Sequence, residues 1–179
     1  MDQGDFHLCW AVAIARCMEA WLALRGVVVE LSPQHLINNI KNMKTQTNLS
    51  QKLRCENCDE PAFKIRDLVH KKDKEVKEEE LIQLVNDGPL LAVIDCYKSF
   101  KKCKDEIYEG QTYCKDTPMG LHVVLVTGFG TTPEGVNYWE IQNSWGTGWG
   151  QNGFGKITRK SSRGKNKPSM FVETIQLVV

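Results

Sequence analysis

Apolar, helix-favouring residues dominate the chain from Cys9 to Arg25. The stretch is rich in Ala, Leu, Met and Trp, contains no glycine or proline, and is followed by Gly26. An unbroken run of good helix formers predicts an α-helix, and a glycine directly after it is a common helix end. Because the apolar positions wrap nearly all the way round, we expect this helix to be buried at the centre of the fold.

The rest of the first half predicts shorter elements. Ser32-Pro33 predicts the start of a helix that reaches Ile40, because serine caps helix N-termini and proline favours the first helical position. The alternating run Lys64–Val69 predicts a strand. The charged run Lys71–Glu80 predicts a solvated loop that leads into a helix over Glu78–Asn86, ended by Gly88-Pro89.

The second half is rich in β-branched and aromatic residues, separated by glycines and polar turns. The predicted strands are Leu90–Ile94, His122–Phe129, Val136–Gln142, Gly153–Arg159 and Phe171–Val179. A helical front half followed by a β-rich back half predicts an α+β fold with two lobes and a cleft between them. We expect the helical lobe to span about residues 1–89 and the β-rich lobe about residues 90–179.

Composition excludes several classes of partner. The 179 residues carry a formal net charge of +1, which gives no reason to expect binding to nucleic acid or to an anionic membrane. No apolar stretch is long enough to span a bilayer. The first five residues, Met1–Asp5, lack the basic and apolar regions of a signal peptide. We therefore expect neither nucleic acid nor membrane as a partner.

Cys9 stands at the predicted start of the long apolar helix. The positive end of a helix dipole and the unpaired N–H groups of the first turn favour thiolate over thiol, and thiolate is the reactive nucleophile. Gln3, six residues upstream, could offer its side-chain amide to a developing oxyanion. Taken alone, a cysteine on an apolar helix is more often a core residue, and we expect that role for Cys17.

Three residues in the second half supply the groups that a cysteine nucleophile needs. His122 starts a predicted strand, and an imidazole there could take the thiol proton and later protonate a leaving amine. Asn143 follows another strand, and its amide oxygen could fix the orientation of the imidazole ring. Trp145 could cover that hydrogen bond and exclude water.

With these residues in place, the chain resembles the papain-like cysteine proteases. The shared segments, in family order, are Gln3-Gly4, Cys9-Trp10-Ala11, Leu31-Ser32-Pro33-Gln34, Gly88-Pro89, Ile107-Tyr108-Glu109-Gly110, His122 with its apolar strand, and the block from Asn143 to Gly150. The resemblance implies a papain-like fold, with a buried central helix in the helical lobe and an antiparallel β-barrel-like second lobe. It also implies that residues 1–179 form a single peptidase domain.

The resemblance also implies a reaction and its residues. Peptide bonds would be hydrolysed through an acyl-enzyme on Cys9, with His122 as acid and base, Asn143 as its orienter and Gln3 as the oxyanion donor. No metal or organic cofactor is implied. The implied partners of a monomeric enzyme are peptide or protein substrates and cystatin-type protein inhibitors. The implied side-chain pocket, formed by Val93, Gly120 and Leu121, favours apolar groups.

The chain departs from the family pattern on the substrate side. Phe6-His7-Leu8 replaces the small residues that usually precede the nucleophile, and the region Asn39–Cys55 is too short for the glycine-rich substrate wall. These departures leave open a catalytically impaired pseudoprotease that binds peptides or protein partners. A Cys–His acyl transferase with another acceptor is a third class, against which the Asn143–Gly150 block argues.

The cysteines bear on the cellular compartment in which the protein is expected. Each of the three disulfides common in the family lacks a partner here, so we expect Cys55, Cys58 and Cys114 to be free thiols or to form pairs foreign to the family. No second close pair accompanies Cys55-x-x-Cys58, so we expect no metal site there. The resemblance implies a vacuole, a lysosome or the extracellular space, whereas the missing disulfide partners and export signal leave the cytoplasm open.

Overall fold

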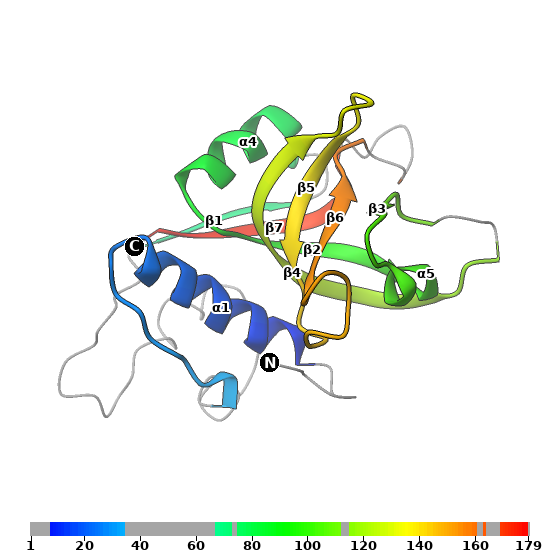
Figure 1. Cartoon of the computed structure of the whole chain (residues 1–179). Helices are drawn as coiled ribbons and strands as arrows, with labels where there is room; N and C mark the ends of the chain where they lie inside the picture. The colour runs from blue at the N-terminus through cyan, green and yellow to red at the C-terminus, as the bar shows by residue number, and fades with distance from the viewer. Residues whose placement is uncertain are drawn as a thin grey trace.

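The computed structural model describes residues 8–34, 67–72, 75–111, 115–160, 163 and 169–178. Its helices are α1 (Cys9–Ala23), α4 (Glu78–Asp87) and α5 (Lys98–Lys102). Its strands are β1 (Asp67–Lys72), β2 (Leu90–Tyr97), β3 (Ile107–Tyr108), β4 (Pro118–Thr131), β5 (Asn137–Gln142), β6 (Phe154–Thr158) and β7 (Phe171–Val178). Figure 1 shows curved strands with α1 and α4 packed against them.

The described strands form one sheet in the order β1-β7-β2-β4-β5-β6-β3. All ladders are antiparallel except that of β3 with β6. Helices and sheet together confirm the predicted α+β class. The sheet is open, because among the described strands no ladder joins β1 to β3 at the two ends of the order. The described strands thus form a curved open sheet, so the β-barrel-like arrangement implied by the resemblance is wrong for them.

The two longer helices lie on opposite faces of this sheet. Leu91 and Leu125 belong to the apolar cluster that receives α1, while their neighbours Leu90 and Val124 belong to the cluster that receives α4. Successive residues of a strand point to opposite faces, so one strand serves both cores. Part of β2 and β4 is buried on both sides, which makes them the rigid centre of the molecule.

Helix α1 is buried along most of its length, as its sequence predicted. Ala11, Ala13, Ile14 and Ala15 are almost inaccessible, and the helix packs on β2 and β4. Cys17 is fully buried, and burial raises the pKa of its thiol, so it has the core role expected of it. The small side chain of Ala13, in the apolar cluster with Leu91 and Leu125, lets the helix approach the sheet closely, which fixes where its first residue lies.

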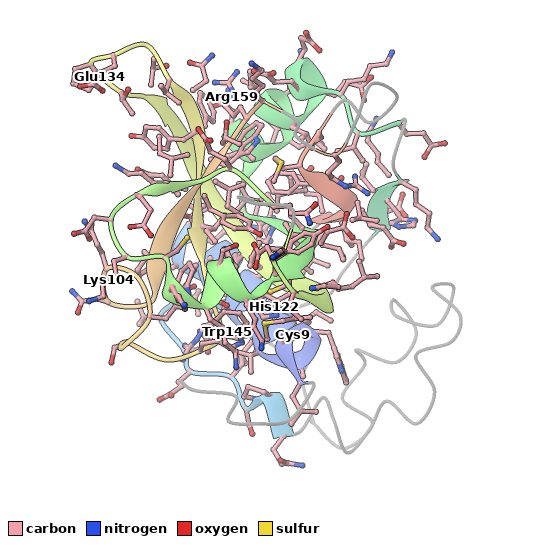
Figure 2. All side chains as sticks on the ribbon, turned by 90° about the vertical axis from the view of Figure 1, so that its right-hand side faces the viewer. Cys9, Lys104, His122, Glu134, Trp145 and Arg159 are labelled. Atoms are coloured by element: carbon pink, nitrogen blue, oxygen red, sulfur yellow. The ribbon has the colours of Figure 1, made fainter. Side chains whose placement is uncertain are left out.

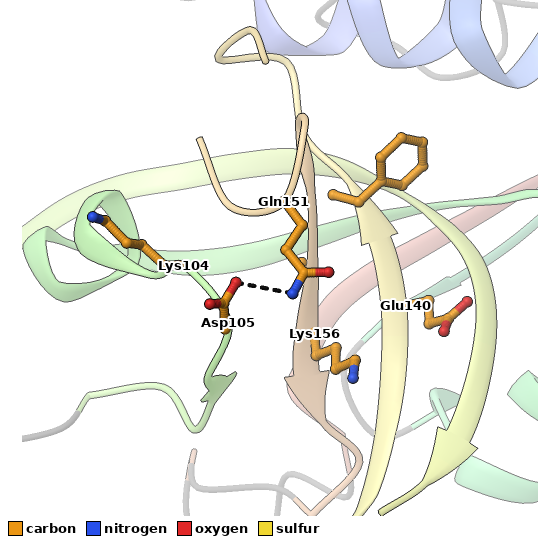
Figure 3. Close-up of a pocket in the computed structure, with 7 residues that line it drawn as sticks. Lys104, Asp105, Glu140, Gln151 and Lys156 are labelled. Carbon is orange, nitrogen blue, oxygen red and sulfur yellow. Dashed lines mark hydrogen bonds between the residues drawn. The ribbon is translucent and has the colours of Figure 1, made fainter. Parts of the chain in front are cut away.

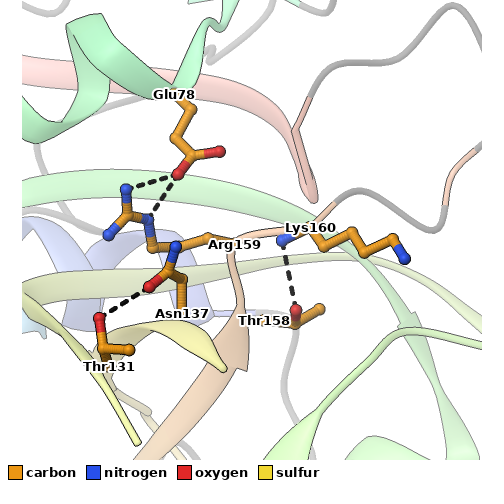
Figure 4. Close-up of polar contacts among 6 residues, drawn as sticks. All are labelled: Glu78, Thr131, Asn137, Thr158, Arg159 and Lys160. Atoms are coloured by element: carbon orange, nitrogen blue, oxygen red, sulfur yellow. Dashed lines mark hydrogen bonds and ion pairs between the residues drawn. The ribbon is translucent and has the colours of Figure 1, made fainter. Parts of the chain in front are cut away.

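Helix α4 is held to the sheet by polar contacts (Figure 4). The Nε of Arg159, at the end of β6, donates to Glu78 Oε1 over 2.8 Å. The guanidinium of Arg159 also lies 5.2 Å from the centre of the Trp139 ring and 5.6 Å from that of Phe129. Such stacking of a partly buried guanidinium stabilises by about 1 kcal/mol or more. The Nε2 of Gln176 donates to the carbonyl of Leu84, which ties α4 to β7 as well.

The predicted elements match the observed ones with local differences. The predicted strand over Lys64–Val69 is β1, whose described span runs to Lys72, so Lys71 and Lys72 belong to a strand and not to a solvated loop. They pair with β7, and the Lys71 amine also pairs with Glu80. Residues 33–34 are helical, and the rest of the helix predicted up to Ile40 lies outside the described residues.

No helix or strand was predicted from the sequence at the positions of α5 and β3. Both lie between Lys98 and Tyr108, where lysines dominate and no apolar period is visible. The short helix α5 follows β2 directly and places Phe100 fully inside the core. Tertiary contacts rather than local propensity create both elements, and α5 turns out to lie beside the candidate site.

Candidate active site

Cys9 is the first residue of α1 and its side chain is half-buried. Leu8 precedes it as the N-cap residue, and the Leu8 carbonyl accepts bonds from Ala11 N (3.0 Å) and Val12 N (3.2 Å). No side chain of the described residues caps this helix end. The thiol therefore lies where the backbone N–H groups of the first turn point outward, as the sequence predicted.

His122 lies on β4, is 5% exposed, and is paired with Ile94 of β2. Its Nε2 lies 2.7 Å from Asn143 Oδ1. The backbone N–H of Ser144 donates to the same Oδ1 over 2.7 Å, which identifies that atom as the amide oxygen. An amide oxygen only accepts, so Nε2 carries the proton in this bond, and in the neutral ring Nδ1 holds the lone pair.

Asn143 is itself fixed by the turn that follows β5. Its backbone N–H donates to the carbonyl of Gly153 over 2.8 Å, and Gly153 has a φ of +90°. The side chain is buried, and its Nδ2 has no hydrogen-bond partner within the described part of the chain. A buried amide held at one end by two donors has little freedom to rotate, so the His122 ring keeps one orientation.

Trp145 covers this pair. Its ring centre lies 4.6 Å from that of His122 with 30° between the ring planes. Phe100 of α5 lies under both, 6.1 Å from His122 and 5.4 Å from Trp145. Trp149 completes the cluster at 4.9 Å from Phe100, and its Nε1 donates to the Phe100 carbonyl over 2.9 Å. These aromatic rings exclude water from the His122–Asn143 bond.

This burial changes the protonation of the imidazole. It lowers the pKa of His122 below its ordinary value of 6.5, and the bond to Asn143 offsets this in part. Desolvation disfavours the charged ring, so the neutral form, with a free lone pair on Nδ1, is favoured at neutral pH. That is the form able to accept a proton.

Cys9 and His122 lie in the same part of the molecule. Figure 2 labels Cys9, His122 and Trp145 together at the start of α1. A charge on Cys9 also influences Cys96, whose pKa rises to about 12 mainly through burial and in smaller part through Cys9. Cys96 pairs across the ladder with Gly120, two residues from His122. Helix α1 and strand β4 thus bring together residues that are far apart in the sequence.

Of the remaining residues predicted from the sequence, some are described by the structure and others lie outside the described residues. Val93 is half-buried on β2, whereas Gly120 and Leu121 are exposed on β4, with Leu121 62% exposed. Gly120 has a φ of +96°, and no atom of the described residues lies within 4 Å of the place a Cβ would occupy. Gln3 lies outside the described residues, as do Cys55, Cys58 and Cys114. The four cysteines that are described, Cys9, Cys17, Cys96 and Cys103, are all thiols.

Sequence reasoning missed the supports of the site. Phe100 and Trp149 contact it from below, and the Lys101 amine lies 5.9 Å from the centre of the Trp145 ring. Only Trp149 stood in a segment that had been noted, the block from Asn143 to Gly150. An aromatic residue isolated among lysines was the one available sign of Phe100.

A hollow lies away from these residues, between the Lys104–Asp105 segment and strands β5 and β6 (Figure 3). Its polar lining includes Lys104, Glu140 and Lys156, and the Gln151 amide donates to Asp105 over 2.9 Å. Within the described ranges, no cluster of three metal-ligating side chains occurs. None of the helices described is long and apolar enough to cross a membrane.

Comparison with known proteins gives a consistent result. The family model described as papain family cysteine protease matches residues 39–173. Vignain from Phaseolus vulgaris is 27% identical over 191 residues, covering 90% of this chain and 51% of that protein. Cathepsin L1 from Drosophila melanogaster is 30% identical over 188 residues, covering 88% of this chain and 50% of that protein. The chain thus spans about half the length of these curated relatives.

Solved structures share the fold. The bromelain protease from Ananas comosus, solved in complex with the E64 inhibitor, has a TM-score of 0.77 at 19% identity and covers 99% of this chain and 92% of that one. The digestive procathepsin L2 proteinase from Tenebrio molitor has a TM-score of 0.74 at 22% identity, covering 99% of this chain and 63% of that one. At these identities the likeness is one of fold.

Proposed function

Because this chain belongs to the papain family of cysteine proteases, we propose that it is a cysteine-type endopeptidase with Cys9 as its nucleophile. The observation that carries the proposal is the buried His122–Asn143 hydrogen bond beneath Trp145, near the start of the helix that presents Cys9. A tethered, neutral imidazole in the same part of the molecule as a half-buried thiol supports acyl transfer through that cysteine.

In the proposed reaction, His122 Nδ1 takes the proton of the Cys9 thiol, and the sulfur attacks the carbonyl carbon of the peptide bond. The backbone N–H at the start of α1 and the Gln3 side chain bind the oxyanion that forms. When the C–N bond breaks, His122 returns the proton to the leaving amine. A water, deprotonated by His122, then hydrolyses the thioester and restores the thiol.

Asn143 and Trp145 have supporting roles in this proposal. Asn143 holds Nε2–H so that Nδ1 points toward the sulfur, and Trp145 keeps water from competing for Asn143. Neither takes part in bond making. Removing either one should slow the reaction without changing which peptide is cleaved.

Substrate choice is assigned to the exposed end of β4. Gly120 leaves open space where a side chain would stand, Leu121 presents an apolar surface beside it, and Val93 lies on the neighbouring strand. An apolar side chain of a peptide suits this surface. We propose peptide or protein substrates, recognised by one domain of residues 1–179 that acts as a monomer and is open to cystatin-type inhibitors.

Hydrolysis of fluorogenic peptides with apolar side chains tests the proposal. We expect Cys9→Ala to abolish turnover and His122→Ala to lower kcat by about 10²–10⁴-fold, the usual contribution of a general acid–base. His70→Ala is the matched control, because His70 bonds to Glu173 on the β1–β7 ladder. Turnover by the unaltered protein no higher than that of Cys9→Ala would contradict the proposal.

Peptide binding measured together with turnover distinguishes the endopeptidase from the pseudoprotease. The bulky residues 6–8 before the nucleophile are the observation that favours it. A catalytically impaired relative would bind the peptide in calorimetry and release it uncleaved. Binding together with Cys9-dependent turnover supports the endopeptidase, and binding alone supports the pseudoprotease.

A further inference from the structure

The short helix α5 supports the candidate site from below. Phe100, in its middle, is fully buried and contacts the rings of His122, Trp145 and Trp149. Its carbonyl also accepts the Trp149 indole N–H. One residue thus packs against the imidazole, its aromatic cover and the ring beside that cover. A displacement of α5 would therefore act on all three rings.

Five residues are too few to hold a helix by internal bonds alone. Tyr97, the N-cap residue of α5, provides no side-chain cap. The hydrogen-bond acceptors for the first turn of α5 come instead from the segment before β4, seventeen residues further along the chain. Asp116 Oδ1 accepts the backbone N–H of Ser99 over 3.2 Å, and its Oδ2 accepts the Ser99 hydroxyl. The carbonyl of Thr117 accepts the N–H of Lys98 over 3.0 Å.

Asp116 is 3% exposed, which is unusual for a carboxylate. A buried charge is stable only when hydrogen bonds replace its water, and both oxygens of Asp116 have such a bond. Bonds to a charged acceptor are stronger and more directional than neutral ones. We call this contact the Asp116–Ser99 clip, and it fixes the first turn of α5.

We propose that Asp116 is a positioning residue for His122: through the Asp116–Ser99 clip it holds α5, so that Phe100 keeps His122 packed under Trp145 and bonded to Asn143. Asp116 touches no reacting atom. The proposal rests on the proposed function for its catalytic meaning, while its structural content concerns the His122 ring alone.

The test follows the ring proton that the clip is proposed to protect. NMR of ¹⁵N-labelled full chain gives the tautomer of His122 and the exchange rate of its Nε2 proton. We expect the unaltered protein to hold the Nε2–H tautomer with slow exchange. In Asp116→Ala and Ser99→Ala we expect exchange at least about tenfold faster and a mixture of tautomers, because Phe100 no longer keeps the ring dry.

Two variants control this test. Ser99→Thr keeps the hydroxyl and should restore slow exchange. Asp105→Ala removes an exposed carboxylate that bonds to Gln151, and it should leave the His122 proton unchanged. If Asp116→Ala fails to fold, Ser99→Ala carries the test alone, since the carboxylate then retains the Ser99 backbone N–H.

If the Asp116–Ser99 clip stabilised α5 without positioning His122, the measurement would give a different result. Backbone amides of α5 would then exchange faster in Ser99→Ala while the tautomer and proton exchange of His122 stayed within about twofold of the unaltered protein, and that would overturn the proposal. The outcome is separate from that of the proposed function. A chain without Cys9-dependent turnover would defeat the endopeptidase, yet the NMR measurement would still decide the role of Asp116.

Discussion

At the scale of single residues, the candidate site depends on the orientation of one ring. His122 could present either nitrogen to Cys9, and Asn143 decides between them by accepting from Nε2. The backbone N–H of Ser144 decides, in turn, which end of the Asn143 amide faces the ring. Two hydrogen bonds, both 2.7 Å long, therefore select the tautomer that leaves Nδ1 free as a base.

The lowered pKa of His122 makes a prediction about stability. The unfolded ring titrates near 6.5, and the folded ring resists protonation to a lower pH. In Cys9→Ala, which removes the neighbouring thiol, the free energy of unfolding should be steady above pH 6.5. It should decline as the pH falls from 6.5 through the folded pKa.

Urea unfolding between about pH 5 and about pH 7.5 measures this dependence. Replacing the ring as well, in Cys9→Ala/His122→Gln, should flatten the curve over that interval. Equal slopes for the two proteins would show that burial of His122 does not depress its pKa.

Gly150 makes a second residue-level prediction, in the turn that follows Asn143. It has a φ of +56°, and an added Cβ would lie 2.1 Å from the carbonyl oxygen of Phe154. Gly150→Ala should therefore destabilise the protein by about 2–4 kcal/mol. Gly148→Ala is the matched control, because no atom in the described part of the chain lies within 4 Å of its Cβ position. Chemical denaturation of both variants checks this, and equal losses would contradict it.

Sequence and structure agree best where a motif is local. Asn143 and Trp145 are two residues apart, so one short block of sequence indicated both, and their roles in orienting and covering His122 could be anticipated together. Phe100 and Asp116 could not, because their importance comes from contacts across 17 to 49 residues that leave no period or spacing in the chain.

At the scale of elements, α1 determines where Cys9, the proposed nucleophile, lies. The helix was predictable because its propensity and burial agree, with alanine at five of its 15 positions and a glycine after its end. In α5, by contrast, local helix propensity and burial do not agree. Three hydrogen bonds to residues 116–117 hold this helix in place. The sequence could therefore predict the element that carries Cys9 but not the one that supports His122.

Close packing of α1 gives a prediction at this scale. Ala13 is buried against Leu91, Leu125 and Leu177 of the sheet. Ala13→Leu should lower the free energy of unfolding by about 1–3 kcal/mol, because the added atoms must displace strands β2 and β4 or the helix. Ala23→Leu, at the exposed end of α1, should change it by less than about 0.5 kcal/mol.

Urea denaturation of these two variants gives the comparison. Displacement of the helix should also slow turnover in Ala13→Leu, since Cys9 would shift relative to His122. Similar stability for the two leucine variants would mean that the helix has room to move and does not fix the position of Cys9.

At the scale of the whole molecule, one open sheet carries helices on both faces, and the site forms where the first helix meets the fourth strand. The α+β class followed from composition along the chain, with helix formers in front and β-branched residues behind. Whether the sheet closes into a barrel could not be predicted from the sequence. Strand order depends on pairing between distant segments, such as β1 with β7.

The central claim is that Cys9 is an activated nucleophile supported by His122. Labelling with an electrophilic epoxide peptide, followed by mass mapping, measures it most directly. The account predicts rapid labelling at Cys9, none at that position in Cys9→Ala, and a rate lower by about 10²–10⁴-fold in His122→Ala. Labelling of Cys9 in the unaltered protein no faster than that of a free model thiol would contradict it.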